Sequence, residues 1–251
     1  MQSDKQWVVV VGATGAFGSV MVERFLGLGY GVLAVARSED KLLALAERHA
    51  RLRPCVADIS QDSAVQAIAQ ALPGPVRMVV HGPGVSVGGG VRDIQTSALV
   101  DAVNIKVGGM LRLVRAVDAR LLPDARLVAI GGHYGFEPTA YACAAGVCNA
   151  ALVNLVRQLS LAYGERSISA HLVAPGPADT ERLRRVAADR ARLNGTTLDA
   201  VLDAMKAESS LHAFTEPAQV AWALEMLLAP EAAAMTGSSL MLDVGRRRGL
   251  P

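Results

Sequence analysis

Charged and aromatic residues are scarce in this sequence. Of its 251 residues only 19% are charged and 4% are aromatic, and the formal net charge is +2. So small a net charge gives no electrostatic reason to expect a nucleic acid or an anionic membrane as a partner. Hydrophobic residues make up 51% of the chain, which is typical of a compact globular protein and excludes an intrinsically disordered one.

Cysteine is scarce as well. The three cysteines, Cys55, Cys143 and Cys148, form no C-x-x-C pair, so we predict no metal site. Their odd number favours reduced, buried thiols and a cytoplasmic location. Glycine, proline or a charged residue breaks every apolar run well before about 18 residues, and we therefore expect no membrane span. The polar start MQSDKQW also lacks the basic and apolar pattern of a signal peptide.

Short β-branched runs alternate with longer segments of helical spacing. The strand-like runs are residues 7–12, 31–36, 54–58, 76–82, 125–132, 167–176 and 237–245. The helical segments are residues 15–29, 39–50, 61–72, 101–122, 139–164, 178–213 and 217–229. Strands separated by helices predict βαβ units with right-handed crossovers. We therefore expect one α/β domain over residues 1–251, a Rossmann-type doubly wound parallel sheet of about seven strands with helices on both faces.

A glycine-rich turn follows the first predicted strand. The segment VVVVGATGAFGS places Gly12, Gly15 and Gly18 between that strand and the next helix, with Thr14 and Phe17 among them. Bare glycines let a phosphate-bearing ligand approach the backbone, and a helix N-terminus offers it unpaired N–H groups and a positive potential. This context predicts a dinucleotide site. The alternative is a turn that serves only packing.

The end of the second predicted strand indicates which dinucleotide binds. An acidic residue there would hold the ribose 2′-hydroxyl of NAD, whereas an arginine accommodates the 2′-phosphate of NADP. The strand ends in Ala36, Arg37 and Ser38, with no carboxylate before Glu39. We therefore expect NADP(H) to be favoured over NAD(H), unless Arg37 is only a solvated loop residue. Asp58, after the third strand, is expected either to hold the adenine or to cap the next helix.

Taken together, these segments resemble the short-chain dehydrogenase/reductase family over nearly the whole chain. GATGAFG is similar to the family's glycine turn, in the spacing typical of its extended and atypical members, and ADI (57–59) is similar to its adenine-side motif. HGPGVS (81–86) lies where the family has Asn-Asn-Ala-Gly, and VAPGPADT (173–180) resembles the Pro-Gly motif beside the nicotinamide. The resemblance implies that the following residues bind the cofactor: Asp58, Ile59, Gly82, Gly84, Pro175, Gly176 and Thr180.

The resemblance also implies a catalytic set of four residues. In the family an asparagine anchors a water chain, a serine orients the carbonyl, a tyrosine transfers the proton, and a lysine binds the nicotinamide ribose and lowers the tyrosine pKa. Asn104, in VNIKVGG, and Tyr141 occupy matching positions. Gly132 stands at the serine position, and Ala145 stands four residues after Tyr141, where the family has lysine. We expect an atypical member that lacks the active-site serine and lysine.

Loss of the lysine affects the two directions of the reaction unequally. A phenol titrates near pH 10 without help, so only about one tyrosine in a thousand is ionised at pH 7. Oxidation of an alcohol needs the ionised form of Tyr141 as a base, and this form is scarce at pH 7. Reduction of a carbonyl needs the neutral form of Tyr141 as an acid, and this form is abundant. We therefore expect the chain to act in the direction of reduction.

Other polar residues are candidates to replace the missing groups. His133 and Tyr134 directly follow the serine position. His133 is expected either to give a hydrogen bond or a proton to a carbonyl oxygen or, like Tyr134, only to shape the pocket. Ser86 is a further polar candidate on the nicotinamide side.

Two histidines and one lysine are expected to have no catalytic part. His81 and His171 are expected to satisfy backbone groups near strand ends. Lys106 lies two positions after Asn104 on a predicted helix, so it should point in a different direction. We expect Lys106 to be a surface residue.

The second half of the chain carries the expected specificity and assembly elements. Residues 178–213 resemble the family's variable substrate-binding lid, in which Leu183, Leu198, Leu202 and Met205 either line the site or pack on the body of the domain. By analogy with the family, the helices at 101–122 and 139–164 imply a homodimer or a homotetramer. The run 246–248, three arginines, is expected to be a solvated tail or an anion site.

Three functions are open at this point. The first is an NADP(H)-dependent oxidoreductase of a CH–OH/C=O pair, which reduces a small-molecule carbonyl or related substrate with an altered proton-delivery site. The second is a cofactor-binding protein without turnover, acting as a regulator or partner subunit. The third is a non-redox enzyme, such as an isomerase or a cyclase, that reuses the pocket.

Overall fold

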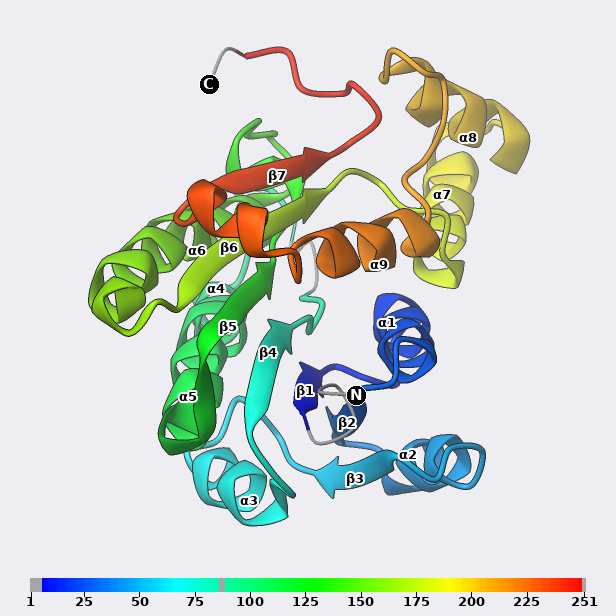
Figure 1. Ribbon diagram of the computed structural model, residues 1–251. Coiled ribbons are helices and arrows are strands. Elements are labelled where there is room, and N and C mark those ends of the chain that lie inside the picture. Colours follow the sequence, from blue (N-terminus) through cyan, green and yellow to red (C-terminus); the bar gives the residue numbers. More distant parts are fainter. Residues whose placement is uncertain (1–5, 86–88, 250–251) are drawn as a thin grey trace.

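The computed structural model describes residues 6–85 and 89–249, and within them seven parallel strands form one sheet (Figure 1). The strand order is β3-β2-β1-β4-β5-β6-β7, which is that of a doubly wound dinucleotide-binding fold with one further strand. The strands are β1 (Trp7–Val11), β2 (Gly31–Ala36), β3 (Leu52–Val56), β4 (Val76–His81), β5 (Leu121–Ile130), β6 (Ser169–Pro175) and β7 (Ser239–Leu242). The predicted fold class is confirmed.

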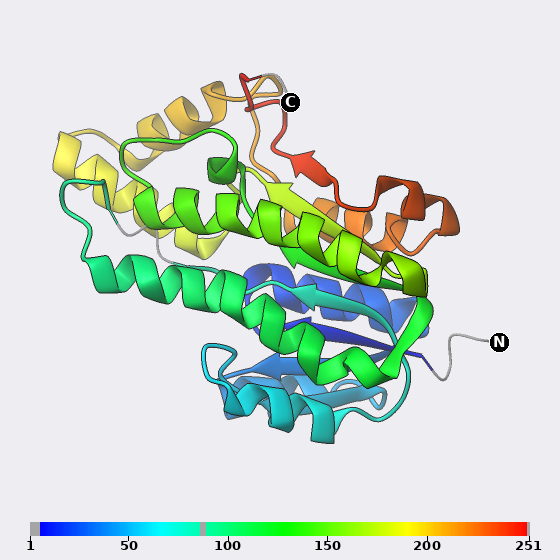
Figure 2. The same cartoon turned by 90° about the vertical axis from the view of Figure 1, so that its left-hand side faces the viewer.

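Helices cover both faces of this sheet (Figures 1 and 2). One face carries α1 (Ala16–Gly27), α2 (Glu39–Ala46) and α9 (Pro217–Met226), and the other carries α3 (Ser63–Ala71), α5 (Gly109–Val117) and α6 (Cys143–Tyr163). The remaining helices are α4 (Thr96–Val103), which leads toward α5, and α7 (Glu181–Asn194) and α8 (Leu198–Ala207), which follow β6. None of the described helices is long and apolar enough to cross a membrane.

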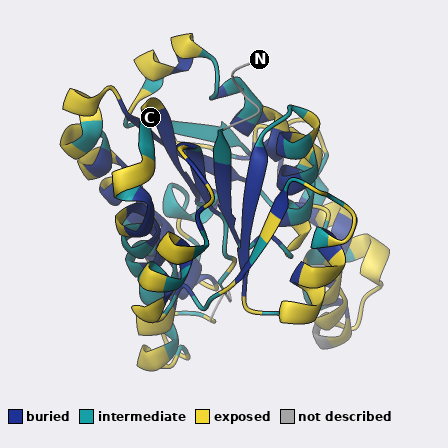
Figure 3. Cartoon of the chain, turned by 60° about the horizontal axis from the view of Figure 1, so that its bottom comes forward, coloured by how far each residue is buried: buried dark blue, intermediate teal, exposed yellow. Residues whose placement is uncertain are grey.

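The apolar side chains of the sheet form a core on each face. In β1, Val9 and Val11 pack in the cluster of α3, α5 and α6, whereas Val8 and Val10 pack in the cluster of α1 and α9. This division follows from the alternation of side chains along a strand. Because both faces are covered, the strands read as continuous apolar runs, and Figure 3 shows the buried sheet between more exposed helices.

The predicted helix 101–122 is divided in the structure. It comprises the end of α4, a π-helical turn at Asn104–Gly108, α5 and a 3-10 turn at Asp118–Arg120, after which β5 begins at Leu121. A π turn is rare and occurs mostly as a single turn, frequently at functional sites. The π turn therefore marks residues 104–108 as candidates for a functional role.

Two further helix boundaries differ from those predicted. The polar segment 178–213 is two helices, because Gly195 ends α7 in a left-handed conformation with φ of 62°. The predicted helix 139–164 begins only at Cys143. Tyr141 thus precedes α6, and Tyr141 and Ala145 are not one turn apart on a regular helix.

Arg126 joins the middle of the sheet to the end of α9. Its guanidinium is only 1% exposed. Nε donates to the Leu227 carbonyl at 2.7 Å, and the two terminal nitrogens donate to the Asp124 carbonyl at 2.5 Å and the Ala229 carbonyl at 3.0 Å. Burial lowers the pKa of Arg126. These bonds hold the C-terminal end of α9, whose last carbonyls have no partner within the helix.

Replacement of Arg126 by methionine should therefore destabilise the fold. Arg126→Met keeps the aliphatic volume but leaves buried carbonyls without donors, and we expect the free energy of unfolding to fall by about 2–4 kcal/mol. Urea unfolding followed by circular dichroism measures this loss. Arg120→Met, at an exposed position, is the matched control and should change stability by less than about 0.5 kcal/mol. Equal effects of the two substitutions would contradict the role of Arg126.

Candidate functional site

A cavity of about 460 Å³ opens at the carboxyl ends of β4, β5 and β6. Gly82 follows β4, Ile130 and Pro175 end β5 and β6, and all three line it together with Phe17 from the start of α1. Open α/β sheets bind ligands in this position, outside the carboxyl ends of the strands. The sheet therefore brings together residues that lie far apart in the sequence.

The glycine turn beside this cavity allows a very close approach of two backbone segments. Gly12 has φ of 84°, in the left-handed region, and its N–H donates to the Val35 carbonyl at 2.8 Å. A Cβ atom on Gly18 would overlap the Gly12 carbonyl oxygen and the backbone of Ala13. The first turn of α1 has no side-chain cap, so its N–H groups are available to an anion.

The structure brings about half of the predicted site residues into the cavity. Those that line it are Phe17, Gly82, Gly84, His133, Tyr141, Pro175, Gly176 and Thr180. The others do not line it: Gly12, Thr14, Gly15, Arg37, Ser38, Asp58 and Ile59 lie in the turns after β1, β2 and β3, Gly18 lies in the first turn of α1, and Asn104 lies in the π turn. Ser86 lies outside the described residues.

The residues after β2 and β3 form a separate polar edge. Arg37 is exposed, and its charge acts on Asp58. The Asp58 carboxylate accepts hydrogen bonds from the Ser60 N–H at 3.0 Å and the Ser60 hydroxyl at 2.8 Å. The bond from the Ser60 N–H is the main reason that the pKa of Asp58 is lowered, and the nearby Arg37 and Arg112 lower it further. Asp58 thus stabilises the turn that precedes α3.

Asn104 faces away from the cavity. Its side-chain N–H donates to the Ser60 carbonyl at 3.0 Å, and its side-chain oxygen accepts from Arg112 at 2.9 Å. The amide therefore connects the π turn to the loop before α3, and the structure does not bring it to Tyr141.

Tyr141 lies at the cavity wall with Tyr134 as its partner. The two hydroxyl oxygens are 2.9 Å apart, and the rings meet edge to face. Tyr141 is 38% exposed, and the Arg190 guanidinium lies 4.6 Å from the centre of its ring. Burial, together with the hydrogen bond to Tyr141, raises the pKa of Tyr134. Tyr134 therefore stays a neutral phenol at pH 7.

His133 is too buried to carry a charge at neutral pH. It is 4% exposed, its ring packs against Tyr134 with centroids 4.0 Å apart, and it hydrogen-bonds the Pro175 carbonyl. Burial, and then the nearby charge of Arg246, lowers its pKa to about 4. Of the two roles expected for His133, a hydrogen-bond donor fits this environment, whereas an imidazolium acid at pH 7 does not.

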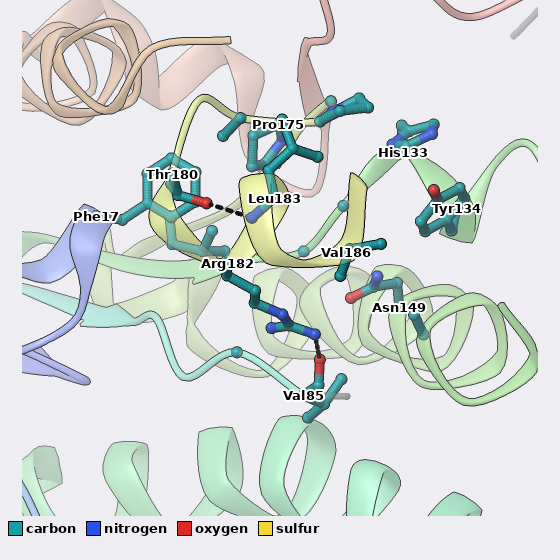
Figure 4. Close-up of a pocket in the computed structure, with 18 of the residues that line it drawn as sticks. Phe17, Val85, His133, Tyr134, Asn149, Pro175, Thr180, Arg182, Leu183 and Val186 are labelled. Carbon is teal, nitrogen blue, oxygen red and sulfur yellow. Dashed lines mark hydrogen bonds between the residues drawn. The ribbon is translucent and has the colours of Figure 1, made fainter. Parts of the chain in front are cut away.

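The space in front of Gly132 is occupied by Asn149, which we did not predict. A Cβ atom on Gly132 would lie 3.0 Å from the Asn149 side-chain nitrogen. Asn149 is buried, lines the cavity from α6 (Figure 4), and its side-chain oxygen has no hydrogen-bond partner. Asn149 lies one helical turn after Ala145, so the two share a face. This spacing is the signal that could have identified it.

The prediction that Lys106 is a surface residue is wrong. It is 4% exposed, lines the cavity, and donates from Nζ to the Ile130 carbonyl at 2.7 Å. Lys106 and Asn104 do point in different directions, but Asn104 is the one that faces away. The helical positions of Leu99, Ala102 and Val103, which pack against α6, share a face with residue 106.

The two strand histidines are both neutral. His81 Nε2 is 2.9 Å from the Ile105 carbonyl, and burial lowers its pKa to about 3. His171 Nε2 is 2.9 Å from the Ser169 hydroxyl, and burial lowers its pKa to about 4. His81 therefore satisfies a backbone carbonyl, as expected, and His171 hydrogen-bonds the Ser169 hydroxyl and, as expected, a backbone group, that of Met235.

Helix α7 forms the upper wall of the cavity (Figure 4). Thr180 caps it by accepting from the Leu183 N–H at 3.3 Å, and Arg182 donates to the Val85 carbonyl. Leu183 lines the cavity, and so does Met205 of α8. Of the other leucines expected in the lid, Leu202 packs against α7 and Leu198 is exposed.

Arg246 is not a solvated tail residue, because it is buried and pairs with Glu208.

Comparison with known proteins identifies the family. The family model described as enoyl-(acyl carrier protein) reductase matches residues 12–247, and the chain belongs to the short-chain dehydrogenase/reductase family. Galactitol 2-dehydrogenase of Rhizobium johnstonii is 25% identical over 257 residues, which cover 96% of this chain and 95% of that protein.

Two solved structures illustrate the likeness. The NADPH-bound short-chain oxidoreductase of Pseudomonas aeruginosa PAO1, which contains an atypical catalytic center, has a TM-score of 0.86 and 25% identity, covering 99% of this chain and 98% of that one. L-sorbose reductase of Gluconobacter frateurii, complexed with NADPH and L-sorbose, has a TM-score of 0.88 and 21% identity over the same shares. The latter likeness concerns the fold alone.

Reintroduction of a serine at position 132 should be costly. Gly132→Ser forces its Cβ against the Asn149 amide, and we expect the free energy of unfolding to fall by about 1–3 kcal/mol. In the Asn149→Ala background the same change should cost much less, which a double-mutant cycle by urea unfolding measures. Gly164→Ser, where nothing lies within 4 Å of the new Cβ, is the control. An equal cost of Gly132→Ser in both backgrounds would refute the contact.

Proposed function

We propose that this chain is an NADP(H)-dependent reductase of a small-molecule carbonyl or a related electron-poor group. The observation that carries this proposal is the position of the Tyr141 hydroxyl, hydrogen-bonded to Tyr134, on the wall of the same cavity that is bordered by the glycine ends of β4 and β5. A proton donor and a cleft for a dinucleotide thus share one space.

The charge of the cavity and the uncapped start of α1 both suit a dinucleotide. No side chain caps the first turn of α1, so its N–H groups can receive a phosphate. The described lining contains Lys106, Arg182 and Arg190 and no carboxylate, which favours a polyanionic ligand. When bound, NADPH would supply the hydride. The side chains present then have to hold the substrate and deliver one proton.

Tyr141 is our candidate for the proton donor. Its hydroxyl carries a proton that a carbonyl oxygen could accept, and the 2.9 Å hydrogen bond links it to the hydroxyl of Tyr134. Because burial raises the pKa of Tyr134, that residue stays a neutral phenol and supplies no base. The arrangement is suited to the reduction of a carbonyl and is poorly suited to the oxidation of an alcohol.

Asn149 is our candidate for the group that orients the carbonyl. Its side-chain nitrogen lies in front of Gly132, where the resemblance places a serine hydroxyl. An amide N–H can donate to a carbonyl oxygen as a hydroxyl does, and a fixed donor stabilises the negative charge that develops there. The buried His133 ring lines the same wall and offers no charge at pH 7.

A cofactor-binding protein without turnover is the second candidate. The observation in its favour is that the Tyr141 hydroxyl is bonded to another neutral phenol, whose pKa is raised, and is not bonded to a cation. Such a pair is a weak acid, and a protein of this kind would bind NADPH without transferring its hydride.

Tyr141→Phe separates these two candidates. In a reductase the loss of the donor should lower kcat by at least about tenfold for a substrate that the wild-type protein reduces, with little change in the affinity for NADPH. Turnover is followed by the loss of NADPH absorbance across a panel of ketones and aldehydes. Tyr163→Phe, at the end of α6, is the matched control. An unchanged kcat would remove Tyr141 from the mechanism, and no turnover of any substrate by the wild-type protein would favour the second candidate.

The preference for NADP(H) rests on Arg37 at the end of β2. Its exposed guanidinium can hold a 2′-phosphate through two hydrogen bonds. Arg37→Ala should lower the affinity for NADPH by at least about tenfold and the affinity for NADH by less than about twofold. Fluorescence titration measures both affinities. Arg53→Ala, at an exposed position in β3, is the control for the loss of one charge. An equal loss of affinity for both nucleotides would contradict the assignment of the 2′-phosphate to Arg37.

A further inference from the structure

Lys106 is a buried ammonium without a carboxylate partner. Within residues 6–85 and 89–249 its ammonium donates to the Ile130 carbonyl at 2.7 Å and forms no ion pair. Moving an ion of this kind out of water costs several kcal/mol even in a real protein interior. The fold does not require that cost, because methionine would fill the same space.

The groups around Lys106 compensate its charge only in part. From β4 it faces His81, which is neutral; from α6 it faces Cys148, whose thiol has a pKa raised by burial; and from α7 it faces the like charge of Arg182. Burial is the main reason that the pKa of Lys106 falls to about 8; Cys148 raises this pKa, and Arg182 lowers it. An anionic or hydroxyl-rich ligand in the cavity would supply the missing partner.

The ammonium lines the cavity at the carboxyl end of β5, where Nζ donates to the Ile130 carbonyl. Gly131 and Gly132, which follow β5, line the same cavity. Ala145 lines it from α6, and the π turn that carries Lys106 packs against that helix. Cys148, three residues after Ala145, is close enough to affect the pKa of Lys106, so Lys106 and Ala145 meet the cavity from neighbouring helical segments.

We propose that the Lys106 ammonium binds ribose oxygens on the nicotinamide half of the dinucleotide, so that the cation that the family carries on α6 comes here from the π turn. This inference rests on the proposed function. An ammonium has three N–H donors, of which the Ile130 carbonyl uses one. The remaining donors are available to two oxygens of a ribose.

The inference predicts a pH dependence of binding that is independent of turnover. A bound ligand that accepts from the ammonium stabilises its charged form, so affinity is highest below the pKa of about 8 in the free protein and falls as the pH rises through it. We expect the affinity for NADPH to fall by about tenfold between pH 7 and pH 9.5.

The test compares wild-type protein with Lys106→Met by fluorescence titration with NADPH, and by calorimetry with 2′,5′-ADP. We expect Lys106→Met to lower the affinity for NADPH by about tenfold at pH 7. The substitution should also remove most of the pH dependence of this affinity. Binding of 2′,5′-ADP, the adenine half of the cofactor, should be unchanged. Ala145→Lys added to Lys106→Met should restore part of the affinity. Lys206→Met, which removes an ammonium paired with Asp203, should behave like the wild type.

The alternatives give different results. If Lys106 is only structural, Lys106→Met lowers the temperature of unfolding and leaves the affinity for NADPH and its pH dependence as in the wild type, which overturns the inference. Equal weakening of NADPH and 2′,5′-ADP would also overturn it, since it would place the effect outside the nicotinamide half. Failure of the wild-type protein to bind either nucleotide would overturn the proposed function, whereas full binding by the variant overturns this inference alone.

Discussion

The contact between Gly12 and Gly18 is the constraint on which the cleft depends. Because neither residue has a side chain, α1 can begin directly against the turn that leaves β1. The start of α1 then points across the carboxyl edge of the sheet, where β4, β5 and β6 also end. Every residue of the candidate site takes its position from that edge, and α7 covers it from above.

Within this frame, polar groups enter the cavity from positions other than those the family resemblance indicates. The space before Gly132 receives an amide from α6, and the end of β5 receives an ammonium from the π turn. Both groups come from helices that pack against the floor of the cavity. A pocket can thus keep a donor and a cation while the residues at two motif positions change, provided that neighbouring backbones are close enough for another side chain to reach.

The sequence was sufficient to predict the fold and the glycine turn after β1, because these follow from local patterns. Continuous apolar runs predict strands covered on both faces, and glycines after the first strand predict the turn. Lys106 and Asn149 were missed for different physical reasons. The helical spacing shows only that the side chains of Lys106 and Asn104 point in different directions. Which of the two faces the interior depends on packing, which the spacing does not give. Asn149 fills a space that exists only because Gly132, 17 positions earlier in the sequence, has no side chain.

The three hydrogen bonds from Arg126 to backbone carbonyls also affect the order in which this chain can fold. Two of the acceptors, on Leu227 and Ala229, lie 101 and 103 residues later in the sequence. At a synthesis rate of roughly 5–20 residues per second, a growing chain waits on the order of 5–20 s between the guanidinium and these acceptors. During that interval the centre of β5 holds a charge that has to stay in contact with water. Closure of that face of the sheet is therefore delayed until α9 has left the ribosome.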